Sequence, residues 1–163
     1  MRIIILGTDH ELQRNDQDLK VLITEILVRE QITFVAEENR PMVNTIARDV
    51  SKSMGLRWIQ IDMSIGDQIT AHIDGKLLNR MQLRYDASGN PTSAIRYAPV
   101  EDGIREEFWL DRIQEAAGDG TGLVVCGSLH CLPLAEKTEK RGYKVLSKIF
   151  HPESLAELKP ELY

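Results

Sequence analysis

The sequence predicts an α/β fold, with a mostly parallel central sheet of about four to five strands and helices on both faces. Short, apolar, β-branched runs alternate along the chain with longer segments whose apolar residues recur every three or four positions. The first pattern is typical of buried strands and the second of amphipathic helices. Two of the apolar runs, at 3–6 and 123–126, end directly in a G-x-x-H motif. Two predicted strands therefore carry a histidine just beyond their carboxyl ends.

The predicted elements alternate in a regular order. We expect strands at 2–6, 31–36, 56–61, 123–126 and 143–146. Helical periodicity covers 19–27, which Asn15 or Asp16 can cap, then the segment from Pro41 to Met54, a weaker stretch at 65–77, and the segments 100–117 and 129–141. The Gly, Pro, Asn and Asp residues between Tyr85 and Pro99 predict a long loop, and a short helix is expected after Pro152.

Length and composition narrow the class of protein. A chain of 163 residues fits one domain, 1–163, with a core of its own. The formal net charge is −5 and the Lys and Arg residues form no run, which argues against a nucleic-acid partner. Only two cysteines are present, and no stretch has the length of a membrane span or of a signal-peptide core. We therefore expect a cytoplasmic protein with no membrane partner.

Candidate functional residues gather at strand ends and in the first turns of helices. They are His10, Glu37, Glu38, Arg105, Glu106 and His130, with Asp9 and Asp62 as outer members. In an open α/β sheet the carboxyl ends of the parallel strands form the crevice where ligands bind. His10 and His130, far apart in the sequence, are therefore expected to be neighbours in space.

Two chemistries suit these residue types. His10, Glu37 and His130 can hold a divalent metal, with Glu38 as an alternative carboxylate, and such a metal generates hydroxide from bound water. Alternatively, a histidine oriented by a carboxylate acts as a general base on water, while Arg105 stabilises the developing oxyanion. The cysteines, Cys126 and Cys131, match no standard spacing of zinc ligands and are expected to be small buried side chains.

The order of these motifs resembles a known superfamily. The elements are Gly7 and His10, then Glu37-Glu38, then Arg105-Glu106-Glu107-Phe108-Trp109, and finally Gly127 and His130. In this order they are similar to the TIKI/TraB and erythromycin esterase/ChaN-like superfamily, over residues 1 to about 150. The resemblance implies an α/β fold with its active site at the strand ends. It also implies metal-dependent peptide cleavage or ester hydrolysis, whereas ChaN-like members bind haem.

The expected function is that of a small hydrolase for an ester or peptide-like substrate. His10 and His130 would activate water with the strand-end glutamates, with or without a divalent metal. The alternative from another class is a catalytically silent binding or regulatory module that uses the same cleft for a small anion, a metal or a tetrapyrrole. The sequence also allows a homodimer through the 85–99 loop or the C-terminal tail.

Overall fold

The computed structural model describes residues 1–39, 43–71, 84–85, 91–93 and 99–151 of the chain. The strands are β1 (Arg2–Thr8), β2 (Ile32–Glu37), β3 (Arg57–Gln60), β4 (Arg84–Tyr85), β5 (Pro91–Ser93), β6 (Thr121–Gly127) and β7 (Lys144–Ile149). The helices are α1 (Leu12–Asn15), α2 (Gln17–Arg29), α3 (Ile46–Ser53), α4 (Ile65–Thr70), α6 (Pro99–Ala116) and α7 (Ser128–Lys140). No described helix is both long and apolar enough to cross a membrane.

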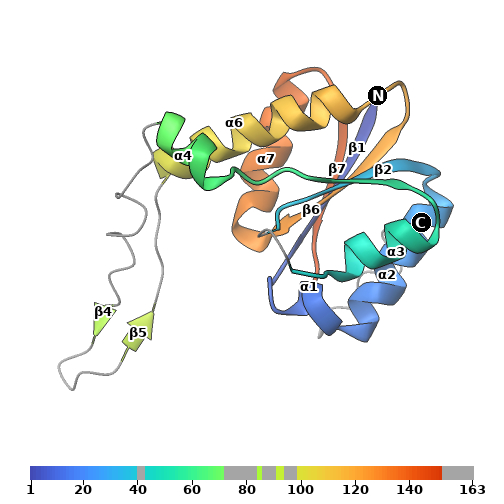
Figure 1. The fold of residues 1–163 in the computed structure, drawn as a ribbon, viewed down its shortest axis with the longest axis horizontal. Coiled ribbons are helices and arrows are strands. Elements are labelled where there is room, and N and C mark those ends of the chain that lie inside the picture. Colours follow the sequence, from blue (N-terminus) through green and yellow to red (C-terminus); the bar gives the residue numbers. More distant parts are fainter. Residues whose placement is uncertain (40–42, 72–83, 86–90, 94–98, 152–163) are drawn as a thin grey trace.

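The main sheet has five strands in the order β3-β2-β6-β1-β7. Every pairing in it is parallel, which confirms the predicted α/β fold (Figure 1). The late strand β6 lies between β1 and β2, so the ends of three strands that are distant in sequence meet at one edge. Thr8 at the end of β1 is aligned with Gly127 at the end of β6. This alignment brings the two G-x-x-H motifs side by side.

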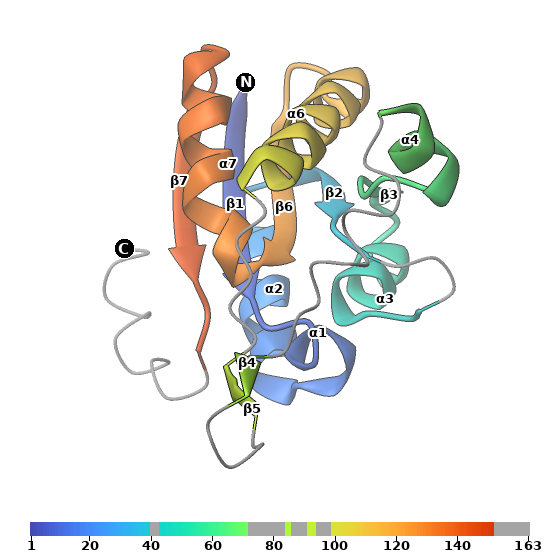
Figure 2. The ribbon, with the colours of Figure 1, turned by 90° about the vertical axis from the view of Figure 1, so that its left-hand side faces the viewer.

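Helices cover both faces of the sheet, as Figure 2 shows. One core packs α2 and α3 against residues such as Leu6, Val35 and Val125. The other packs α6 and α7 against Ile5, Ala36 and the strand residues beside them. Because successive side chains of a strand point to opposite faces, neighbouring residues such as Val35 and Ala36 belong to different cores.

Several boundaries differ from those that the sequence predicts. The helix expected to begin at Pro41 begins at Ile46, because Thr45 is extended and caps it by accepting a hydrogen bond from the amide of Arg48. Asp16 is the N-cap of α2, as predicted, but a short helix α1 precedes it. The expected 85–99 loop contains β5, which pairs antiparallel with β4. Pro99, at the end of that expected loop, is the first residue of α6. Residues 86–90 and 94–98 of the loop, residues 72–77 of the weak helix and the tail after Pro152 lie outside the described residues.

Gly7, in the first G-x-x-H motif, allows α7 to pack closely on β1. A Cβ atom at this position would lie 2.6 Å from Cβ of Cys131, the residue that follows His130 in the second motif. Cys131 is fully buried, and its thiol donates to the carbonyl of Lys148 at 3.4 Å. The absence of a side chain at Gly7 therefore sets how close His130 comes to the end of β1.

We expect Gly7→Ala to lower the free energy of unfolding by roughly 1 to 3 kcal/mol, because the added methyl group overlaps a packed side chain. Urea denaturation followed by circular dichroism measures the change. Gly118→Ala is the matched control, since a Cβ atom there meets nothing within 4 Å. Equal stability of the two variants would contradict this account of the packing.

Candidate functional site

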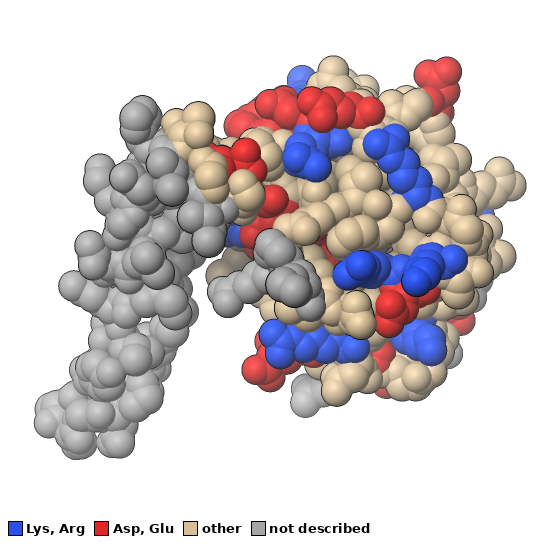
Figure 3. Space-filling view, in the orientation of Figure 1, with Lys and Arg blue, Asp and Glu red and all other residues tan. Residues whose placement is uncertain are grey.

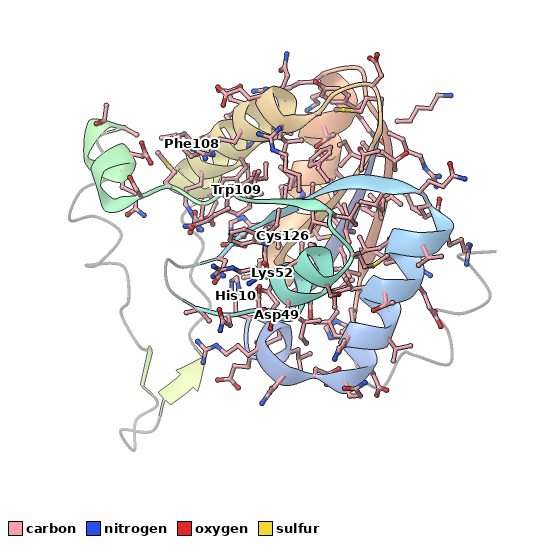
Figure 4. The ribbon with its side chains drawn as sticks, turned by 45° about the vertical axis from the view of Figure 1, so that its right-hand side comes forward. His10, Asp49, Lys52, Phe108, Trp109 and Cys126 are labelled. Atoms are coloured by element: carbon pink, nitrogen blue, oxygen red, sulfur yellow. The ribbon has the colours of Figure 1, made fainter. Side chains whose placement is uncertain are left out.

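A cluster of charged and polar side chains lies at the carboxyl edge of the sheet, on the face covered by α6 and α7. Glu38 follows β2, His10 follows β1, and His130 lies in the first turn of α7 directly after β6. Arg105 and Glu106 project from α6. Figure 4 shows Trp109 of α6 and Cys126 of β6 with His10 below them. We call the set His10, Glu38, Asp62, Arg105, Glu106 and His130 the strand-end cluster.

Glu38 lies at the centre of the strand-end cluster. Its backbone amide donates to the carbonyl of Val125 at 2.9 Å, which continues the sheet pairing beyond β2. Its side chain is only 5% exposed, with Oε2 accepting from the Gly127 amide at 2.8 Å. Its Oε1 accepts from Nη2 of Arg105 at 2.7 Å. The Nε2 atoms of His10 and His130 each lie 3.8 Å from the same Oε1, so both imidazoles face one carboxylate oxygen.

Gly127 explains how His10 and Glu38 come so close to the end of β6. A Cβ atom on Gly127 would lie 3.0 Å from Nε2 of His10 and 3.3 Å from Oε2 of Glu38. A side chain at this position would therefore displace one of these two groups. The glycine of the second motif makes room for the histidine of the first.

His130 is held by a chain of charged hydrogen bonds between α6 and α7. Its Nδ1 donates to Oε1 of Glu106 at 2.9 Å, and Oε2 of Glu106 accepts from Lys137 at 2.9 Å. Because Nδ1 carries the proton, the lone pair of the neutral ring is on Nε2, where it accepts from Nη1 of Arg105 at 3.4 Å. Oε1 of Glu38 lies 3.8 Å from the same nitrogen. Burial alone would lower the pKa of His130, but the hydrogen bond to Glu106 and the charge of Glu38 outweigh it and raise the pKa above 6.5.

Arg105 bridges several carboxylates. Its Nε and Nη2 donate to Oδ1 of Asp62 at 3.2 and 2.9 Å, and Nη2 also donates to Glu38. Its guanidinium lies 5.0 Å from the ring centre of the buried Trp109. Burial alone would lower the pKa of Arg105, but Asp62 and Glu38 raise it. The remaining nitrogen, Nη1, lies 3.4 Å from Nε2 of His130 and 3.6 Å from Asp102.

His10 lies on the solvent-exposed side of the strand-end cluster. Its side chain is 57% exposed, in contrast to 10% for that of His130. Its Nδ1 lies 3.4 Å from Oε1 of Gln13 in α1, which orients the ring with Nε2 toward Glu38. A molecule from solvent therefore reaches the cluster beside His10.

Glu37 lies apart from the other predicted residues, on the opposite face of the sheet. Its Oε2 accepts hydrogen bonds from Thr45 at 2.6 Å and from the indole of Trp58 at 2.8 Å. Its Oε1 is buried and has no hydrogen-bond partner among the described residues. Burial raises the pKa of Glu37 to about 7, although the two hydrogen bonds lower it. Glu37 thus links β2 to β3 and to the start of α3.

The structure thus brings together five of the six main predicted residues and the outer residue Asp62. Asp9 is exposed and instead accepts a hydrogen bond from the amide of Glu11. The sequence interpretation missed Asp102 and Lys137. Asp102 lies three residues before Arg105, and Lys137 lies seven residues after His130 on α7. Helical spacing places Asp102 near Arg105, whereas Lys137 meets its partner Glu106 across two helices.

The described residues do not fit a metal ion. Glu37, one of the three predicted ligands with His10 and His130, faces the other side of the sheet. Within the described ranges no group of three or more His, Cys, Asp and Glu side chains is placed to hold a metal. Arg105 already supplies the cation beside Glu38 and His130. Cys126 and Cys131 are buried free thiols, and burial raises the pKa of both.

We expect Glu37→Gln to stabilise the protein increasingly as pH rises from 4.5 to about 7. In this range folded Glu37 keeps its proton while the unfolded chain has lost it, so rising pH destabilises the wild type, by up to roughly 3 kcal/mol. Gln has no proton to lose and retains an oxygen for Thr45 and Trp58. Urea denaturation at several pH values measures the difference, with the exposed Glu107→Gln as control. A stability difference between Glu37→Gln and the wild type that does not change with pH would contradict the raised pKa of Glu37.

We also expect His130 to titrate above pH 6.5 in the wild type and at a lower pH in Glu106→Gln, because the variant loses the charged hydrogen-bond acceptor of Nδ1. Titration of the histidine ring signals by NMR measures both values. Glu107→Gln serves again as control, since Glu107 pairs with Arg141 and not with His130. An unchanged His130 titration in Glu106→Gln would show that Glu106 does not control this histidine.

Comparisons with protein-family models, with curated proteins and with solved structures find no match to this chain. The resemblance of its motifs to the TIKI/TraB and erythromycin esterase/ChaN-like superfamily therefore stays a prediction. What carries a functional assignment is the geometry of the strand-end cluster, above all the position of His130 between Glu106 and Glu38.

Proposed function

We propose that the strand-end cluster is the active site of a hydrolase that uses histidine as a general base on water, without a metal ion. One observation carries this proposal. His130 is fixed through Nδ1 by Glu106 and presents Nε2 toward the oxygen of Glu38 that also faces His10. A histidine held by a carboxylate on one nitrogen, with the other nitrogen near a carboxylate oxygen that a second histidine also faces, is a suitable arrangement for moving protons to and from a substrate.

In this reaction Nε2 of His130 takes a proton from a water molecule as the water oxygen attacks an acyl carbon. The imidazolium that forms is stabilised by Glu106 at Nδ1 and by Glu38 near Nε2. Lys137 binds the second oxygen of Glu106 and keeps that carboxylate in place. When the tetrahedral intermediate collapses, the bond to the leaving group breaks, and the leaving group takes its proton from His130 or from the more exposed His10.

Arg105 has two roles in this proposal. Its Nε and Nη2 bind Asp62 and Glu38, and these contacts fix the central carboxylate. Its Nη1 is within hydrogen-bond distance of Nε2 of His130, at 3.4 Å, and forms an ion pair with Asp102 at 3.6 Å. Once Nε2 of His130 has taken the proton it no longer accepts from Nη1, which then donates to the oxyanion that forms next to the attacking water.

The charge balance favours a neutral ester or amide as the substrate. Glu38, Asp62, Asp102 and Glu106 surround Arg105 and Lys137. Carboxylates thus outnumber the permanently charged cations, and a small anionic ligand would meet net repulsion. For this reason the alternative of a silent module that binds a small anion is less well supported than hydrolysis.

The test is a screen of the purified, untagged chain against p-nitrophenyl esters and short peptides, with and without added zinc or manganese. We expect metal-independent turnover whose kcat/KM increases with pH through the raised pKa of His130, above 6.5. His130→Gln and Glu106→Gln should each lower kcat/KM by about 100-fold or more. Glu107→Gln is the matched control, because its exposed side chain pairs with Arg141 and Lys137 and, among the described residues, with no member of the strand-end cluster.

Two outcomes would overturn the proposal. Turnover that appears only with an added metal would show that the cluster rearranges to bind one. No turnover of any substrate by a folded wild-type chain would favour the binding module. Circular dichroism of each variant shows whether a loss of activity reflects unfolding.

A further inference from the structure

Gln13, in the short helix α1, is a polar side chain that is almost fully buried beside His10. It is 3% exposed, and its backbone amide donates to the carbonyl of Asp9 at 3.3 Å. Its side-chain amide lies 3.4 Å from Nδ1 of His10, the ring nitrogen that does not face Glu38. A buried amide requires hydrogen-bond partners. The way in which Gln13 meets His10 therefore determines which ring nitrogen carries the proton.

The amide of Gln13 can meet Nδ1 of His10 with its oxygen or, after a half-turn, with its nitrogen. With the oxygen toward the ring, Nε2 of Gln13 is buried and has no hydrogen-bond partner among the described residues. With the nitrogen toward the ring, one of its hydrogens is donated to Nδ1. The carbonyl oxygen then takes the buried position, where a missing partner is tolerated more often than for an N–H group. The second arrangement is therefore favoured, and in it the neutral ring of His10 has its proton on Nε2.

Glu38 favours the same position of the proton. Its Oε1 lies 3.8 Å from Nε2 of His10. A lone pair on Nε2 would be repelled by this carboxylate oxygen, whereas an N–H group is attracted to it. The 3.8 Å separation is too long for a direct hydrogen bond, and the side chain of His10 is 57% exposed. The Nε2–H group of His10 therefore remains available to an oxygen atom of a substrate.

The two histidines consequently differ in the group behind the ring. Behind His130 is the carboxylate of Glu106, 2.9 Å from Nδ1, which stabilises an imidazolium. Behind His10 is the neutral amide of Gln13, and a hydrogen donated by this amide opposes a second proton on Nδ1. His130 can thus gain and lose a proton at Nε2, whereas His10 is held as a neutral hydrogen-bond donor.

We propose that Gln13 positions His10 to donate to the carbonyl oxygen of the substrate, so that His10 and Arg105 bind the oxyanion and His130 alone carries the proton. This inference rests on the proposed function. Water adds its oxygen to the acyl carbon and gives a proton to Nε2 of His130. When the bond to the leaving group breaks, the alcohol or amine leaves with that proton, and His10 keeps its own. No other reactant is required.

Two donors to one carbonyl oxygen suit an uncharged acyl substrate. Arg105 and His10 both approach Oε1 of Glu38, so they are neighbours in the strand-end cluster. A neutral N–H group stabilises an oxyanion as it forms without adding a charge to the site. On the face drawn in Figure 3, acidic and basic side chains are interspersed, so that face offers no field of one sign to attract a charged substrate. Hydrogen bonds within the cluster are what a neutral ester or amide requires.

The first experiment locates the proton on His10 by NMR, since protonated and bare ring nitrogens differ in their nitrogen chemical shifts. It uses the wild-type chain at about pH 8.5, well above the ordinary pKa of histidine. We expect the proton on Nε2. Gln13→Glu should place a proton on Nδ1, because a carboxylate accepts but does not donate. Gln17→Glu, the same substitution at an exposed position of α2, should change nothing.

The wild-type spectrum decides the inference even where Gln13→Glu does not fold. A wild-type His10 that is protonated at Nδ1, or at both nitrogens, would overturn the inference whether or not the chain hydrolyses any substrate. If no ester is hydrolysed while the proton of His10 is on Nε2, the proposed function fails and the tautomer assigned to His10 stands.

The second experiment compares substitutions of the two histidines in the hydrolysis of p-nitrophenyl acetate. Glutamine retains an N–H donor but cannot carry a proton. His10→Leu should lower kcat/KM by about 100-fold, the loss typical of one oxyanion donor, and His10→Gln by less than about tenfold. His130→Gln and His130→Leu should both lower it by about 100-fold or more, and Gln17→Glu should leave it unchanged. Equal losses in His10→Gln and His10→Leu would show that His10 carries a proton, which would overturn the inference and leave hydrolysis intact.

Discussion

Burial of the Glu38 carboxylate determines how the rest of the site is arranged. A carboxylate removed from water requires hydrogen bonds and opposite charge in compensation. Glu38 obtains them from the Gly127 amide at the end of β6 and from Arg105 on α6. Arg105 is itself fixed by Asp62, which follows β3. One buried charge thus ties the ends of β2, β3 and β6 to α6 and leaves one oxygen facing both histidines.

The two glycines of the repeated motif have complementary roles. Gly7, in the first motif, leaves room for Cys131, next to the histidine of the second. Gly127, in the second motif, leaves room for His10 of the first. Because β1 and β6 are paired with Gly127 opposite Thr8, each glycine lies where the other motif approaches most closely. The repetition of G-x-x-H in the sequence therefore reflects two neighbouring strands whose ends require the same clearance.

Much of the fold, and the main members of the site, could be predicted from local sequence patterns. A buried strand appears in the sequence as an apolar run, regardless of which helices pack on it. The carboxyl ends of parallel strands meet at one edge of the sheet. The start of α3 could not be predicted from Pro41, because the helix begins where Thr45 bonds to Glu37, a residue on another element. Lys137 was missed for a similar reason. Its partner Glu106 lies on α6, and the sequence does not show how α6 and α7 are aligned.

The pair Glu37-Glu38 shows most clearly where sequence reasoning ends. Consecutive residues at the end of a strand point to opposite faces, so only one of these glutamates can join a cluster that lies on one face. Which one does so depends on α6 supplying Arg105 to one face, while α3 and β3 supply only neutral donors, Thr45 and Trp58, to the other. Arg105 compensates the buried charge of Glu38, and both histidines face that carboxylate. Without a cation within hydrogen-bond distance, Glu37 has a raised pKa and links structural elements. The same residue type at adjacent positions thus has different chemistry because the neighbouring elements differ.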